Sequence, residues 1–138
     1  MAKERIDAGK APHVHIAHCD GDLAVQGWAE PALQLAGEYV VEETEKGYRM
    51  TCSGDLRLRV PTGGSVYIEQ VSGDAAVKHL TGVCAIDRVH GDAVLVDLGR
   101  VEVNVIHGDL VVRGAVEEVS VGEIHGDLSA RNTAAIAI

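Results

Sequence analysis

The sequence predicts an all-β protein with one domain, a single-stranded parallel β-helix whose right-handed coils of about 18 residues stack into a short rod. Two observations predict this fold. A glycine followed by an acidic residue recurs along most of the 138 residues, and apolar residues alternate at fixed distances from each glycine. A unit of about 18 residues is too short for a crossover helix between parallel strands. The chain is therefore expected to coil directly upon itself.

The spacing of the glycine-acid pairs defines the repeat. Successive glycines are 16 to 19 residues apart. They are Gly21, Gly37, Gly54, Gly73, Gly91, Gly108 and Gly126. The residues two before, two after and four after each glycine are apolar in 21 of 21 places. This alternation predicts strands with one apolar face, and the number of glycines predicts about seven coils.

Each glycine is expected to mark a corner between two strands of one coil. There it would supply a positive φ or a bulge, and the acid beside it would cap a turn amide. Residues 26–50 fit the repeat least well and include the charged run 42–46. We expect a bulged or longer excursion there, without loss of a coil. Residues 1–13 are polar and predict a flexible tail before a solenoid domain of residues 14–138.

Composition argues against several partners. With 12 Lys and Arg against 21 Asp and Glu, the net charge of −9 opposes binding to nucleic acid or to an anionic membrane. Neither a signal-peptide pattern nor an apolar run of about 20 residues is present. We therefore expect a cytoplasmic protein without membrane insertion. The three cysteines have unrelated spacings and predict buried thiols.

Four segments carry a resemblance to known solenoids. They are VSGDAAV, VHGDAVLV, IHGDLVV and IHGDLSA. Over about residues 14–138, the chain resembles the adhesin β-helix family with SGD-type strand repeats, a group of bacterial domains largely of unknown function. It also resembles the bactofilin class of cytoskeletal β-helices. The first resemblance implies the fold, and the second implies polymerisation through the ends.

Three histidines form a candidate metal site. His90, His107 and His125 directly precede three consecutive glycines of the repeat, which predicts a column with a spacing of about 4.8 Å. Zinc needs three or four ligands at about 2.0 to 2.3 Å, whereas the outer members of such a column lie about 10 Å apart. We expect a stacked polar corner and no metal or other cofactor. A metal-binding histidine ladder is the alternative.

Catalysis has little support in the sequence. The acidic column is interpreted as turn caps, in preference to calcium ligands or a catalytic carboxylate pair. Its members are Asp55, Asp74, Asp92, Asp109 and Asp127. The chain contains no GxSxG, Walker or GxGxxG motif, and its four aromatic residues offer a poor platform for a sugar. We expect that the protein is not an enzyme; a carbohydrate-active enzyme is a less favoured alternative.

Self-association is the expected function. Outward positions with apolar residues predict a lateral contact through Ala76, Val94, Val96 and Val111. The first coil starts with Val14 and Ile16, and Ile136 and Ile138 occupy the columns of Val119 and Val121. These four residues predict an end-to-end contact.

The expected partner is thus a second copy of the chain, in a head-to-tail filament or a closed dimer. The filament is favoured because neither end shows a sequence that would cap it. An adhesive or ligand-binding domain is the alternative, and it would require an exposed aromatic or polar groove that the sequence does not clearly show.

Overall fold

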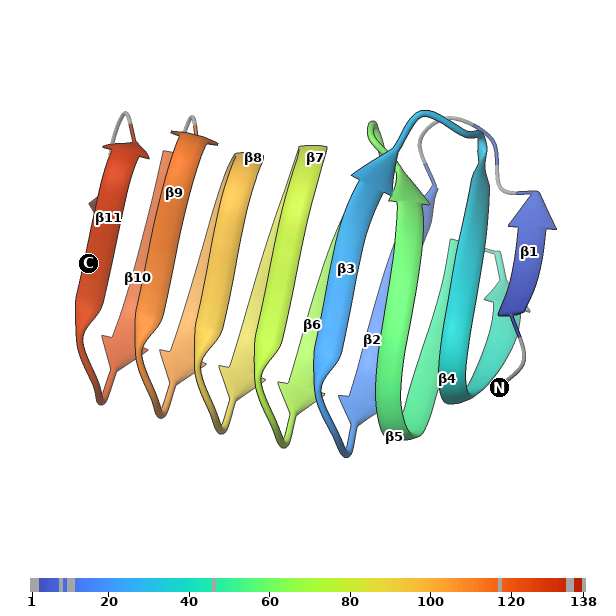
Figure 1. The fold of residues 1–138 in the computed structure, drawn as a ribbon, viewed down its shortest axis with the longest axis horizontal. Helices are drawn as coiled ribbons and strands as arrows, with labels where there is room; N and C mark the ends of the chain where they lie inside the picture. Colours follow the sequence, from blue (N-terminus) through green and yellow to red (C-terminus); the bar gives the residue numbers. More distant parts are fainter. Residues whose placement is uncertain are drawn as a thin grey trace.

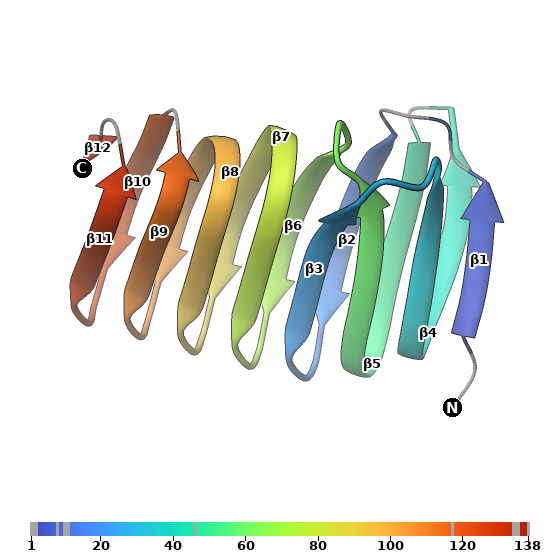
Figure 2. The ribbon, with the colours of Figure 1, turned by 45° about the horizontal axis from the view of Figure 1, so that its top comes forward.

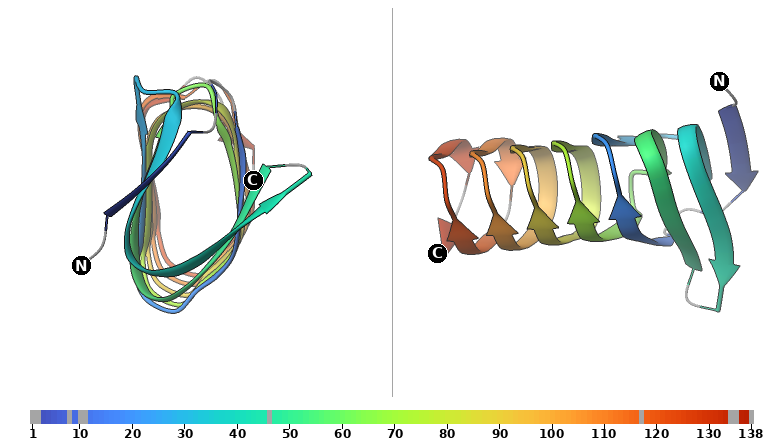
Figure 3. Two further views of the ribbon diagram at one scale, coloured as in Figure 1. Left: turned by 90° about the vertical axis from the view of Figure 1, so that its right-hand side faces the viewer. Right: turned by 90° about the horizontal axis from the view of Figure 1, so that it is seen from below.

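The computed structural model describes residues 3–7, 9, 12–45, 47–116, 118–133 and 136–137. The fold is all-β, and its parallel strands close into a ring, as in a β-solenoid (Figure 3). The strands lie side by side along the long axis, with β1 at one end and β11 near the other (Figure 1). They are β1 (Lys3–Asp7), β2 (His13–Cys19), β3 (Leu23–Trp28), β4 (Ala32–Thr44), β5 (Gly47–Pro61), β6 (Ser65–Val71), β7 (Ala75–Val89), β8 (Ala93–Ile106), β9 (Leu110–Val116), β10 (Glu118–Ile124), β11 (Leu128–Thr133) and β12 (Ile136–Ala137).

Each coil has two faces that meet at a glycine-aspartate corner. Strands β2, β6 and β10 belong to one face, and β3, β9 and β11 belong to the other. The long strands bend from one face to the other. Thus β7 pairs in parallel with β3 near its start and with β6 near its end. Strand pairing therefore continues around the bend and joins one coil to the next.

The core is a set of aliphatic columns, since none of the described polar or charged residues is buried. Residues in equivalent places of neighbouring coils stack upon one another, as Val71, Val89 and Ile106 do at 0% exposure. Most of the 21 apolar positions of the repeat are buried. The exceptions lie in the outermost coils: Tyr39 and Val41 in one, Ile124, Leu128 and Ala130 in the other.

The order of coils along the rod differs from their order in the sequence. The strands follow one another as β1-β4-β5-β2-β6-β7-β8-β10-β12. On one side Val14 pairs with Tyr48 of β5, and on the other with Val66 of β6. Both Val14 and Ile16 are buried, with 2% and 0% exposure. The prediction that these two residues form an end of the rod is therefore wrong.

The irregular stretch reverses direction instead of making a bulged coil. Strand β4 runs antiparallel to β5, with Leu35 opposite Leu58 and Tyr39 opposite Cys52. The charged run 42–46 favours an exposed turn, and Gly47 has a φ of +142°, which glycine adopts with little strain. The β4–β5 hairpin projects beyond the ring in the end-on view (Figure 3, left).

Part of the expected flexible tail is a strand that covers one end of the rod. Strand β1 pairs antiparallel with Ala32–Ala36 of β4, at the right-hand end of the rod in Figure 2. Ile6 packs against the core. Nearby, the guanidinium carbons of Arg5 and Arg59 lie 5.8 and 5.6 Å from the ring centroid of Trp28. The expectation that neither end is capped is therefore wrong at this end.

The observed order of coils predicts unequal costs for two core truncations. Ile16→Ala leaves a cavity between two coils and should lower the free energy of unfolding by about 2 to 5 kcal/mol. Leu128→Ala affects a half-buried side chain in the last described coil and should cost about half as much or less. Urea unfolding followed by circular dichroism measures both. Equal costs would contradict the order β5-β2-β6.

Candidate functional site

The glycine-aspartate corners form a continuous hydrogen-bonded ladder along the rod. At each corner the aspartate Oδ1 accepts a hydrogen bond from the backbone N–H of the aspartate in the next coil, at 2.7 to 2.9 Å. The order is Asp55, Asp22, Asp74, Asp92, Asp109 and Asp127. The acids do bond turn amides, although the amide belongs to the neighbouring coil. Asp22 lies between Asp55 and Asp74 in this column. The sequence could not reveal that position, because it depends on the order in which the coils stack.

The same ladder explains five of the seven repeat glycines, and there the reason differs from the expected one. Gly37, on the reversed strand β4, does have the expected positive φ, of +136°, beside a bulge. None of the repeat glycines at these stacked corners has a positive φ. A Cβ at Gly73 would instead lie 2.2 Å from Asp22 Oδ1, and one at Gly91 would lie 2.1 Å from Asp74 Oδ1. Each aspartate therefore occupies the space that a side chain in the next coil would need. Glycine is required here by close approach.

The predicted histidine column is present beside this ladder. The ring centroids of His90 and His107 are 5.1 Å apart, and those of His107 and His125 are 4.9 Å apart, with interplanar angles of 3° and 14°. His125 Nε2 also lies 3.4 Å from Glu123 Oε2. Within the described ranges, no group of three or more His, Cys, Asp or Glu side chains has a geometry that could hold a metal ion. The stacked rings thus act as a polar corner of the coil.

The three cysteines are buried and free, as predicted. Cys19 and Cys52 lie side by side on β2 and β5. The pKa of the Cys52 thiol is raised, chiefly by the hydrogen bond with Cys19 and to a lesser extent by burial. Burial alone raises the pKa of Cys84 to about 12. A neutral buried thiol is a poor nucleophile at physiological pH.

The edge of the last described coil is open. Strand β11 pairs with β9, and no other described strand pairs with it. Leu110 N–H donates to Asp127 O across the preceding corner, so the equivalent N–H of Leu128 points to the open edge. Ala130, two residues further along the strand, presents its N–H in the same direction. Next to them, Asp127 Oδ1 accepts no amide from the described residues.

The predicted end contact falls in this region only in part. Ile136 pairs with Val119 through the backbone of β12 and β10, which confirms the column assigned to it. Ile138 lies outside the described residues. The apolar side chains that the structure places at the open end are Ile124, Leu128 and Ala130.

The predicted lateral stripe is assembled in the structure. Ala76 pairs with Val94, and Val94 pairs with Val111, on the adjacent strands β7, β8 and β9. Val96 follows on β8, beside Lys78 and Arg113. All four stripe residues are half-buried. Their contact with another protein remains a prediction.

A groove on the outer surface was not predicted. A groove of about 740 Å³ lies between the β4–β5 turn and the outer face of β5, β2, β6 and β7. Arg49, His15, Tyr67 and Ala85 lie in one row across these strands, each paired with the next. His15 and Tyr67 are stacked, with ring centroids 5.0 Å apart.

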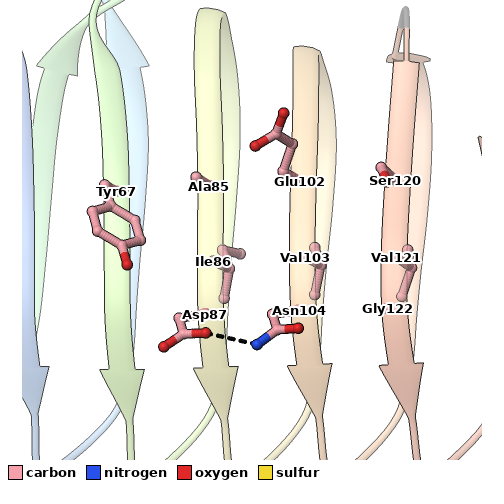
Figure 4. A pocket seen from close by; sticks show the side chains of 10 residues that line it. All are labelled: Tyr67, Ala85, Ile86, Asp87, Glu102, Val103, Asn104, Ser120, Val121 and Gly122. Atoms are coloured by element: carbon pink, nitrogen blue, oxygen red, sulfur yellow. Dashed lines mark hydrogen bonds between the residues drawn. The ribbon is translucent and has the colours of Figure 1, made fainter.

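A shallower hollow of about 390 Å³ continues beyond Tyr67 (Figure 4). Small residues at Ala85, Ser120 and Gly122 leave it open. Asn104 Nδ2 donates to Asp87 Oδ1 at 2.8 Å along its lower rim. Partial burial raises the pKa of Tyr67, and the nearby carboxylates of Asp87 and Glu69 raise it further by smaller amounts. Its phenol is therefore neutral at physiological pH.

Comparisons with known proteins assign no family. No protein-family description, curated protein or solved structure matches the chain. The resemblances to the adhesin and bactofilin β-helices therefore remain predictions. In the part of the chain that the structure describes, no helix is long and apolar enough to cross a membrane.

The corner ladder predicts different effects for two equivalent aspartates. Asp92→Ala removes the acceptor of the Asp109 amide and should lower the free energy of unfolding by about 1 kcal/mol or more. Asp92→Asn keeps an oxygen there and should cost less. Asp127→Ala removes a carboxylate to which no described amide donates, and should be nearly neutral in dilute solution. A cost for Asp127→Ala equal to that of Asp92→Ala, in urea unfolding, would show that the bond between coils is not the cause.

The cysteines predict a simple chemical result. Because the pKa of Cys84 is about 12, only about one molecule in ten thousand carries its thiolate at pH 8. Iodoacetamide at pH 8 should therefore leave Cys84 unmodified in the folded protein and alkylate it in urea, as measured by mass spectrometry. Rapid alkylation of Cys84 under native conditions would disagree with its burial.

Proposed function

We propose that the protein is a non-catalytic structural β-solenoid, a right-handed helix with six stacked glycine-aspartate corners, that associates with a second copy through the open edge of β11. The observation that carries the proposal is this edge itself. Backbone N–H groups at Leu128 and Ala130 and the carboxylate of Asp127 have no partner among the described residues. Exposed sheet edges are templates for strand pairing.

Apolar surface at the same end supports the contact. The inward positions Ile124 and Leu128 are half-buried, whereas Ile106 and Leu110 in the preceding coil are fully buried. Covering a large aliphatic side chain contributes about 1.5 to 3 kcal/mol. A second copy would complete both the hydrogen bonding of the edge and the burial of these columns.

A closed dimer fits the two ends better than the filament favoured by the sequence. In a filament, the β11 edge would meet the other end of the rod, where β4 runs backwards and β1 already pairs with Ala32–Ala36. A two-fold arrangement instead joins identical edges of two copies. The lateral stripe of Ala76, Val94, Val96 and Val111 is proposed as a second, independent contact.

Light scattering of the purified chain tests the proposal. The parent should have about twice the monomer mass of 14.5 kDa at high micromolar concentration. Ala130→Pro removes an N–H that faces the open edge and should yield monomers with an unchanged circular dichroism spectrum. Leu128→Lys should do the same by adding charge to the contact.

A control at the opposite end distinguishes the two assemblies. Val40 is 69% exposed on β4, so Val40→Lys should leave a β11-mediated dimer intact. A parent that stays monomeric would overturn the proposal. Species larger than a dimer that shorten in Val40→Lys would show a filament and exclude the closed dimer.

A further inference from the structure

The groove beside the β4–β5 turn has the size and composition of a small-molecule site. Its volume of about 740 Å³ lies within the range of about 300 to 1,000 Å³ that such sites occupy. The walls come from four strands of the ring face and from Thr44 and Glu45 of the projecting hairpin. A regular solenoid would have no such wall, because the hairpin exists only through the reversal of β4.

One half of the groove is apolar. Only three large hydrophobic side chains are exposed in the described part of the chain, and two of them, Tyr67 and Val83, line this groove at 42% and 39% exposure. Ala85 lies next to Tyr67 and leaves room above the strand. His15 stacks on the other side of Tyr67 and holds its ring in place. An apolar ligand would cover this surface.

The other half contains Arg49 beside histidine and glutamate side chains. Arg49 lies in one row between His15 and Glu42, and no described carboxylate forms an ion pair with its guanidinium. His15 Nε2 is shielded from solvent and makes no hydrogen bond within the described residues, although Glu69 Oε1 lies 3.1 Å away. Shielded polar atoms usually have a partner, which a ligand can supply. Glu45 is the acidic residue on the groove wall.

We propose that this groove binds a small amphipathic organic anion, with its apolar body on Tyr67 and Val83 and its carboxylate on Arg49. One strand separates Arg49 from Tyr67, so their backbones are about 10 Å apart. An aromatic ring joined to a carboxylate by a short alkyl chain spans this distance. The planar guanidinium binds a carboxylate through two parallel hydrogen bonds. Glu42, opposite Arg49, and Glu45 on the wall repel an anion at short range, so the paired hydrogen bonds to the guanidinium must exceed that repulsion.

Titration with three matched probes tests the charge preference. The probes are 4-phenylbutyrate, 4-phenylbutan-1-ol and 4-phenylbutylamine, which share the apolar body and differ in the head group. Protein amide shifts in ¹⁵N–¹H NMR at pH 7 and 0.15 M salt report both site and affinity. The carboxylate should bind at least about tenfold more tightly than the amine, with shifts in β5, β2 and β6.

Two variants and two controls locate the ligand. Arg49→Gln should weaken the carboxylate about tenfold and leave the alcohol unchanged, whereas Tyr67→Ser should weaken all three probes. Arg57→Gln, on the same strand beyond the corner, and Ala130→Pro, at the open edge, should retain parent affinity.

Four results would overturn the proposal. They are tighter binding of the amine, an equal loss in Arg57→Gln, shifts confined to other strands, and no saturable shift below 10 mM probe. Because Ala130→Pro separates the two sites, failure here is distinguishable from failure of the β11 contact.

Discussion

Stacking of one coil on the next depends on a single geometric coupling between glycine and aspartate. The aspartate carboxylate of one coil reaches the amide of the next and occupies the space where a Cβ would stand. A side chain at that glycine would displace the carboxylate, and loss of the carboxylate would leave the amide without its acceptor. The two residues therefore recur together, and the corner adds to the continuous strand pairing that keeps the aliphatic columns and the histidine stack in register.

The sequence predicted the parts of the fold that this coupling repeats. Corners, inward columns and the histidine stack follow from the period alone. Strand direction does not, because inward residues alternate with period two whichever way the strand runs. Leu35, Tyr39 and Val41 fit the apolar columns of the repeat, yet β4 runs backwards and places them opposite Leu58, Cys52 and Met50. The charged run before Gly47 was a signal of a turn, and it indicated irregularity without revealing the reversal.

The groove could not be predicted from the sequence, because it depends on which strands lie side by side. Arg49 and His15 are neighbours only because β5 lies beside β2, and no spacing in the sequence encodes that order. Tyr67 and Val83 carried a signal of their own, since both are large apolar residues at outward positions. The outward stripe of Ala76, Val94, Val96 and Val111, on the opposite face, carries a more regular apolar pattern. Surfaces built from regular coils are thus easier to predict than a surface that joins regular coils to an inserted hairpin.

The interleaved order of coils also determines how the chain reaches its native state. From the later part of β7 onward, each coil pairs with the one that precedes it by about 18 residues, so contacts form between segments close in sequence. Strands β2 and β3 instead pair with β5, β6 and β7, which are synthesised later. The loops that must close around them are longer, and longer loops close at a higher entropic cost. Strands β2 and β3 therefore emerge from the ribosome before the strands with which they pair, and they dock onto coils that follow them in the sequence.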